Sequence, residues 1–133
     1  MPSKIQIPIF CESDVLATVQ KCQSLLIQIE MPIDEATLAL TAVSEVSRNI
    51  LNHATSGEVI LSIVKEDSLS GLSVVAQDSG PGISDIEKSM ADGYSTGKGL
   101  GLGLSVAKES MDEFEIESVL GQGTIVRMRK WVP

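Results

Sequence analysis

Apolar side chains follow two different spacings along the chain, and these spacings predict its secondary structure. Isoleucines at every second position from Ile5 to Ile9 are typical of a strand. Similar short apolar segments predict four more strands, so that the five predicted strands span residues 4–10, 58–66, 72–77, 114–120 and 124–132. A turn over residues 67–71 joins the second and third strands into a hairpin.

Elsewhere the apolar residues recur every three or four positions, which is the spacing of an amphipathic helix. Ser13 or Asp14 can cap the first helix, and Asp34 is expected to cap the second. Pro32 separates the two. The three long helices predicted in this way span residues 13–29, 34–53 and 102–111.

The order of these elements predicts the fold class. Strand pairs joined by hairpins, with helices between them, indicate an α/β fold in which a helix layer covers a mixed, mainly antiparallel sheet. The chain has 133 residues, which suits one domain over residues 1–133. Apolar residues make up 43% of it, so a two-layer sandwich can bury a proper core.

The net charge of −8 argues against nucleic acid as a partner, because an acidic surface repels the phosphate backbone. No basic segment offers contact with a membrane surface, no apolar segment is long enough to span one, and the N-terminus lacks a signal peptide. A cytoplasmic protein is expected. Cys11 and Cys22 form no metal-binding pattern and are expected to be free thiols.

Glu45 and Asn49 lie four residues apart in the second predicted helix and therefore on one face of it, and Asn52 continues that row. An amide oxygen is a suitable ligand for Mg²⁺, and a neighbouring carboxylate can accept a proton from an attacking hydroxyl. A solvated helix face would use the same residues, so the pair is weak evidence alone.

Seven of the eleven glycines fall between residues 78 and 103, where a long loop is predicted with a short helix over residues 84–91. Asp78 stands at the end of the third strand, followed by Gly80 and Gly82. An aspartate there can accept a hydrogen bond from an exocyclic amine, and the glycines let the backbone approach a flat ring. An ordinary strand-end turn has the same composition.

Gly99, Gly101 and Gly103 alternate with leucines directly after Lys98. Their backbone N–H groups can surround an anion, the helix that begins there directs its positive end to the same place, and Lys98 can add a charge. A flexible hinge is the alternative. The spacing fits neither a P-loop nor the dinucleotide-binding G-x-G-x-x-G pattern. Further on, Thr124 leaves a tight turn, where its hydroxyl can reach a ring nitrogen or a bound water.

Taken in order, these four segments resemble the N, G1, G2 and G3 boxes of the Bergerat-fold ATPases, a superfamily that includes gyrase B, Hsp90 chaperones and histidine kinases. Residues 92–96, residues 111–114 and the ending Lys130-Trp131 are also similar to the RsbT-type switch kinases of the bacterial stressosome. The resemblance covers nearly the whole chain from Asp34 onward.

The resemblance implies ATP and Mg²⁺ as cofactors and assigns a role to each matching residue. Glu45 matches the general base and Asn49 the Mg²⁺ ligand. Asp78 matches the residue that binds the adenine amine. The remaining matches are Gly80 and Gly82 beside the adenine, Gly99, Gly101 and Gly103 in the lid around the triphosphate, and Thr124 on the adenine side.

The implied activity is that of a serine/threonine protein kinase. Such kinases phosphorylate STAS-domain scaffold proteins and then bind and activate a PP2C-type phosphatase. Two alternatives remain open: an anti-sigma factor kinase that sequesters a sigma factor, and a non-catalytic binding module gated by ATP. A histidine autokinase is disfavoured, because His53 is the only histidine and is better explained as the C-terminal cap of the second helix.

Overall fold

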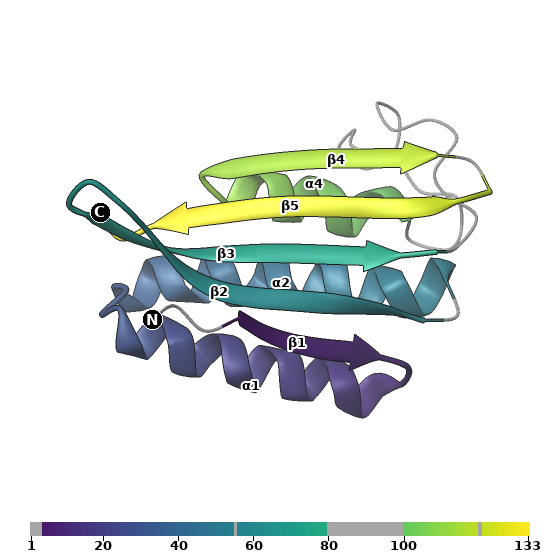
Figure 1. The fold of residues 1–133 in the computed structure, drawn as a ribbon, viewed down its shortest axis with the longest axis horizontal. Helices are drawn as coiled ribbons and strands as arrows, with labels where there is room; N and C mark the ends of the chain where they lie inside the picture. The colour runs from purple at the N-terminus through teal and green to yellow at the C-terminus, as the bar shows by residue number, and fades with distance from the viewer. Residues whose placement is uncertain (1–3, 55, 80–99, 120) are drawn as a thin grey trace.

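The computed structural model describes residues 4–54, 56–79, 100–119 and 121–133, and these form two layers. One layer is a five-stranded sheet with the order β1-β2-β3-β5-β4 (Figure 1). Every strand pair in it is antiparallel. The strands are β1 (Lys4–Ile9), β2 (Gly57–Glu66), β3 (Leu69–Asp78), β4 (Glu113–Val119) and β5 (Gly123–Trp131).

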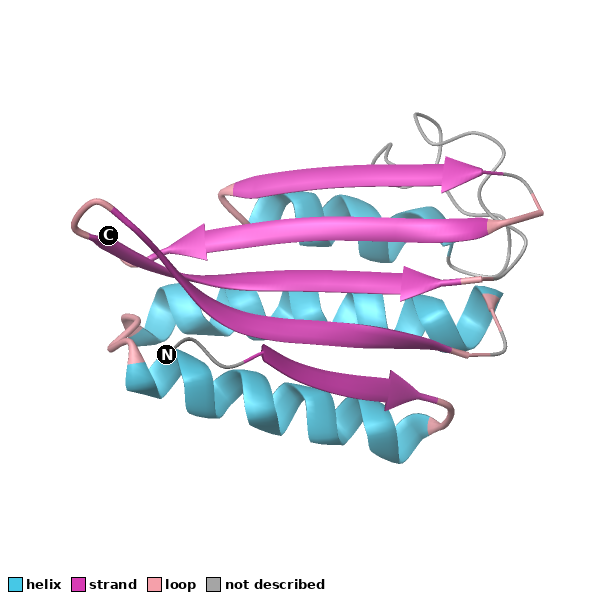
Figure 2. Ribbon diagram, in the orientation of Figure 1, coloured by secondary structure: helices cyan, strands magenta, loops and turns pink. Residues whose placement is uncertain are grey.

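The other layer consists of helices that all cover the same face of the sheet (Figure 2). In the described residues these helices are α1 (Glu12–Gln28), α2 (Ile33–His53) and α4 (Leu100–Ser110). The predicted two-layer α/β sandwich is confirmed. The sheet differs from the mixed sheet that was expected, because the described strands contain no parallel pair. Hairpins join β2 to β3 and β4 to β5, and α1 and α2 lie between β1 and β2 in the chain.

The predicted elements of the described residues are all present, with shifted ends. The hairpin turn is shorter than expected and consists of Asp67 and Ser68 alone. Helix α4 begins at Leu100, so Gly101 is helical and not part of a loop. The expected short helix over residues 84–91 lies outside the described residues.

The N-cap positions differ from those predicted, although Asp14 does take part in the capping box of the first helix. Helix α2 begins directly after Pro32, so Asp34 lies inside its first turn and accepts a hydrogen bond from the N–H of Glu35 at 3.0 Å. At α1 the cap is Cys11, and the Asp14 carboxylate accepts hydrogen bonds from the N–H groups of Phe10 (2.8 Å) and Cys11 (3.2 Å). These two hydrogen bonds lower the pKa of the Asp14 carboxylate, and the bond from Phe10 has the largest effect.

The core lies between the two layers. Leu72, Val74 and Ala76 alternate along β3 toward the helices, and the intervening residues face outward. Val43 and Ile50 are among the residues through which α2 packs on them. Cys22 is buried within this core, which raises the pKa of its thiol to about 12, whereas Cys11 is exposed. Both thiols are free, as expected. No helix in the described part of the chain has the length and apolarity of a membrane span.

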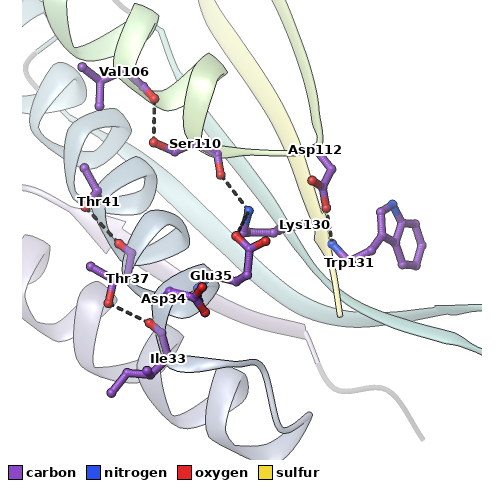
Figure 3. Close-up of polar contacts among 10 residues, drawn as sticks. All are labelled: Ile33, Asp34, Glu35, Thr37, Thr41, Val106, Ser110, Asp112, Lys130 and Trp131. Carbon is purple, nitrogen blue, oxygen red and sulfur yellow. Dashed lines mark hydrogen bonds and ion pairs between the residues drawn. The ribbon is translucent and has the colours of Figure 1, made fainter. Parts of the chain in front are cut away.

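A buried lysine joins the two layers at the end of the sheet where α2 begins (Figure 3). The Lys130 ammonium, on the helix face of β5, lies 3.1 Å from a carboxylate oxygen of Glu35 in the first turn of α2. It also donates a hydrogen bond of 3.0 Å to the carbonyl oxygen of Ser110, the last residue of α4. One side chain therefore holds α2, α4 and β5 together.

We expect Lys130→Ala to lower the free energy of unfolding by about 2–3 kcal/mol, because it leaves a helix-end carbonyl and a half-buried carboxylate without their cation. Urea unfolding followed by circular dichroism measures this loss. Lys108→Ala, at an exposed position of α4, is the control and should change stability by less than about 0.5 kcal/mol. Equal small losses in both variants would contradict the proposed role of Lys130.

Candidate functional site

Four register partners form a row across β2, β3, β5 and β4 at the end of β3. Asp78 is the register partner of Gly57 on β2 and of Thr124 on β5, and Thr124 is in turn the partner of Ser118 on β4. Directly opposed residues of antiparallel strands point to the same face. Since Ala76 on β3 is buried toward the helices, two positions before Asp78, the whole row faces the helix layer.

Two helix ends lie at the same end of the molecule as this row. Figure 1 shows that α2 ends and α4 begins at the same end of the molecule at which β3 ends. Ile50, near the C-terminal end of α2, packs so closely on the sheet that a Cβ atom added at Gly57 would lie 2.9 Å from its Cγ2. The same added atom would lie 3.0 Å from the Cβ of Asp78. The C-terminal part of α2 therefore sits directly beside Asp78.

Glu45 and Asn49 occupy that part of α2, one turn apart, and both are half-buried. The Asn49 amide nitrogen donates a hydrogen bond of 3.1 Å to the backbone carbonyl of Glu45. This bond leaves the Asn49 side-chain oxygen as the atom available to a cation. Within the described residues the Glu45 carboxylate has no hydrogen-bond or ion-pair partner. Asn52, on the same face of α2, is exposed.

Next to Glu45, Arg48 points away toward the start of α1. Its guanidinium forms an ion pair with Glu12. Both side chains are partly exposed, so the pair adds little stability by itself. It places the helix that carries Glu45 and Asn49 beside the first turn of α1.

Thr124 is part of a hydroxyl network that sequence reasoning did not find. Its Oγ1 lies 2.9 Å from the Oγ of Ser118, and Ser118 donates a second hydrogen bond of 3.3 Å to the carbonyl oxygen of Gly123. The signal for Ser118 was present in the sequence. Pairing the last two predicted strands around the turn at Gly121–Gly123 puts Ser118 opposite Thr124.

Two glycines permit the close packing around Asp78. A Cβ atom at Gly123, whose φ is +132°, would lie 2.1 Å from the carbonyl oxygen of Asp78 and 2.9 Å from the Cα of Ser79. A Cβ atom at Gly57 would lie 2.4 Å from the carbonyl oxygen of Gln77. Both contacts involve backbone atoms, which cannot move aside as a side chain can.

A hollow of about 450 Å³ lies at the same end of the sheet. Asp78 and Gly57 line it, but most of its other lining residues come from the outward-facing side or the loops, as Gln77 and Ile125 do. Neither Thr124, Glu45 nor Asn49 borders it. The hollow therefore adjoins the candidate site on the outer side of the sheet and is not the space between the row and α2.

Several predicted site residues fall outside the described residues: Gly80, Gly82, Lys98 and Gly99. Gly101 and Gly103 are described, and both belong to the first turns of α4. The expected start of a helix within the glycine run is thus confirmed, two residues earlier than predicted. Its N-terminus, the positive end of the helix dipole, lies at the site's end of the molecule (Figure 1).

Comparison with known proteins decides the family. Residues 34–133 match the family described as histidine kinase-, DNA gyrase B- and HSP90-like ATPases. The chain belongs to this ATPase family. The resemblance inferred from the four boxes is confirmed, and with it the fold class.

Individual relatives are consistent with this assignment. The chain is 40% identical over 125 residues to a protein of Bacillus subtilis named serine/threonine-protein kinase RsbT, and the alignment covers 93% of each chain. It is 36% identical to an anti-sigma F factor of a Thermoanaerobacter species, over 79% of this chain and 76% of the relative. An anti-sigma F factor of Geobacillus thermodenitrificans is 33% identical, over 79% of this chain and 75% of the relative. The expected enzyme class agrees with the name of the first relative.

We expect Gly123→Ala to lower the free energy of unfolding by about 2–4 kcal/mol, because the new methyl group displaces the backbone of Asp78 and Ser79. Gly121→Ala is a matched control, since Gly121 also has a positive φ, of +80°, but no atom lies within 4 Å of an added Cβ. It should cost only about 1 kcal/mol. Chemical denaturation of both variants measures the difference, and equal losses would show that crowding at Asp78 is unimportant.

Proposed function

We propose that this chain is a serine/threonine protein kinase that uses Mg-ATP to phosphorylate STAS-domain proteins and then activates a PP2C-type phosphatase. The observation that carries the proposal is the register pairing of Asp78 with Thr124, directly beside the part of α2 that holds Glu45 and Asn49. This arrangement occurs in a chain of the ATPase family that is similar, over almost its full length, to a named serine/threonine kinase.

The sheet row provides the adenine site in this proposal. A carboxylate has only hydrogen-bond acceptors, so Asp78 suits the exocyclic amine of adenine. Thr124, beside it on β5, adds a hydroxyl on the same face. Gly80 and Gly82, which follow Asp78 in the chain, are proposed to let the backbone approach the ring.

The C-terminal part of α2 provides the chemistry. Mg²⁺ usually takes one or two protein oxygens and completes its shell with phosphates and waters, so the single side-chain oxygen of Asn49 fits such an ion. Bound there, Mg²⁺ would offset charge on the transferring phosphoryl group. The Glu45 carboxylate, one turn earlier, would accept the proton of the attacking serine or threonine hydroxyl.

The start of α4 is proposed to bind the polyphosphate. Its first N–H groups and positive dipole end favour an anion at the site's end of the molecule. Gly101 and Gly103 lie in these first turns and Gly99 directly precedes them. Lys98 would add a positive charge in a chain whose net charge is −8, where the attraction for ATP has to be local.

The partners of the reaction are inferred from the resemblance and from charge. STAS-domain proteins as substrates and a PP2C-type phosphatase as the later partner follow from the similarity to RsbT-type switch kinases. The acidic surface disfavours nucleic acid. A cytoplasmic location stays a prediction.

A second function is supported by the other relatives. Proteins named anti-sigma F factor share 33–36% identity with about four-fifths of this chain. A kinase that sequesters a sigma factor would use the same nucleotide site. Mixing the purified chain with a sigma factor and with a STAS-domain protein, in the presence of ATP, separates the two functions by which one is bound and which is phosphorylated.

We expect Glu45→Ala to bind ATP almost as tightly as the native chain but to lose about 100-fold or more in phosphoryl transfer, because the proton acceptor is gone. Transfer of labelled phosphate to a STAS-domain protein, with affinity measured separately by calorimetry, tests this. Glu109→Ala, at an exposed position of α4, is the control and should retain activity. Normal transfer by Glu45→Ala would eliminate Glu45 as the base.

We expect Asp78→Asn to weaken ATP binding by about 10- to 100-fold, because the amide offers its NH₂ group where the ligand also donates. Calorimetric titration with ATP measures the dissociation constant. Asp67→Asn, in the hairpin turn at the far end of β3, should bind ATP normally, and asparagine tolerates its positive φ of 55°. Equal ATP affinity in the two variants would refute the adenine assignment.

A further inference from the structure

Helix α2 and strand β3 both come close to the start of β2 at Gly57. This glycine is the first residue of β2 and the register partner of Asp78. A Cβ atom added there would lie 2.9 Å from Cγ2 of Ile50 on α2 and 2.4 Å from the carbonyl oxygen of Gln77 on β3. Carbon atoms in good contact are about 3.5–4.0 Å apart. The close approach of α2 to this end of the sheet therefore depends on the missing side chain of Gly57.

The contact on α2 is directly beside the proposed Mg²⁺ ligand. Ile50 follows Asn49 in the chain, is only 2% exposed and belongs to the core between the layers. Its β-branched side chain has one strongly preferred χ1 in a helix, so Cγ2 does not readily turn away from an added atom. A methyl group at Gly57 would instead push this turn of α2, and Asn49 with it, away from the sheet.

On the sheet side, the same position adjoins the proposed adenine-binding residue. The added Cβ atom would lie 3.0 Å from the Cβ of Asp78. In the proposed complex the base of ATP lies at Asp78, and Mg²⁺ connects its phosphates to Asn49. A ligand that must contact two segments is weakened when one of them moves, because displacements of about 1 Å are enough to spoil such a geometry.

We propose that Gly57 is a positioning residue that sets the separation between Asp78 and Asn49, so that Mg²⁺ can join the phosphates of ATP to α2. The inference rests on the proposed ATP site and adds to it a residue that offers the ligand no side chain. A larger residue at position 57 leaves Asp78 and Asn49 in the chain but changes their spacing. The affinity that ATP gains from Mg²⁺ reports this spacing, since the ion is what connects the nucleotide to α2.

The test measures the dissociation constant of ATP by calorimetry, once with Mg²⁺ and once with EDTA in its place. The ratio of the two constants is the Mg²⁺ enhancement. For Gly57→Ala we expect this enhancement to fall by about five- to tenfold, because α2 no longer presents Asn49 at the right distance. The affinity in EDTA should stay within about twofold of the native value, since ATP without the ion depends little on α2.

Gly71→Ala is a matched control for loss of stability. Gly71 lies near the start of β3, at the opposite end of the strand from Asp78, and it is similarly crowded. An added Cβ atom would lie 2.8 Å from the carbonyl oxygen of Lys130 and 2.7 Å from Cε3 of Trp131. Both glycine variants should lower the midpoint of urea unfolding, but Gly71→Ala should keep the native Mg²⁺ enhancement.

A second substitution tests whether the effect passes through Ile50. Leucine has no Cγ2 branch on Cβ, so Ile50→Leu removes the contact with α2 and leaves the contact with the Gln77 carbonyl oxygen unchanged. In the double variant of Gly57→Ala and Ile50→Leu, the Mg²⁺ enhancement should therefore recover to within about twofold of the native value. If Gly57→Ala does not fold, Ile50→Phe takes its place, because it enlarges the same contact from the side of α2 and should lower the enhancement in the same way.

The possible outcomes separate this inference from the kinase proposal. A fall in Mg²⁺ enhancement that Gly71→Ala does not share and Ile50→Leu reverses supports the role of Gly57. Native enhancement in Gly57→Ala, an equal fall in Gly71→Ala, or no recovery in the double variant overturns that role and leaves the ATP site intact. If the native chain binds ATP equally with and without Mg²⁺, the roles of Gly57 and of Asn49 both fail. If it binds no ATP at all, the proposed function fails as well.

Discussion

The candidate site depends on the antiparallel register of β3 with the strands on either side of it. This register sets Asp78 directly between Gly57 and Thr124 and turns all of them toward the helices. A shift of one residue would turn the Asp78 side chain to the outer face and expose Val74 and Ala76. The buried side chains along β3 therefore hold the site residue in place, since a sheet that keeps its core also keeps Asp78 inward.

The glycines at the two flanking strands are part of the same constraint. Without side chains, Gly57 and Gly123 let α2 and the start of β5 approach the backbone around Asp78 within distances at which any Cβ would collide. The opposite end of the sandwich is fixed differently, by the contacts of Lys130 with Glu35 and Ser110. A buried cation thus stabilises one end of the sandwich. The candidate ligand site lies at the other end.

Glu45 and Asn49 on α2 and the row across the sheet carry different chemical groups at the same end of the molecule. The row carries a carboxylate and two hydroxyl groups, and α2 carries a carboxylate and an amide oxygen one turn apart. Neither set would be convincing alone, because strand-end turns and solvated helix faces contain the same residues. Their location at the same end of the sandwich, in a chain of this ATPase family, supports the common role in nucleotide chemistry that we propose.

Local pattern was sufficient for much of this protein. Alternating and helical spacings predicted each strand and helix of the described residues, because burial of one face imposes those periods on any sequence. The order of the four boxes predicted the family. It also identified Glu45, Asn49, Asp78 and Thr124 as candidate site residues. The errors at Asp34 and Asp14 were local too, since several residues near a helix start can cap it and only the backbone path selects one.

Tertiary structure decided what depends on residues far apart in the chain. Strand order and register join Asp78 to Thr124, 46 positions later in the numbering, and no local period encodes such pairing. Burial of Lys130 depends on the packing of α2 and α4 against β5. By itself the sequence determined which side chains are available for the chemistry, because residue types and spacing are local. Only the folded sheet decided which of them meet, because hydrogen bonds and close contacts between strands exist in no single segment.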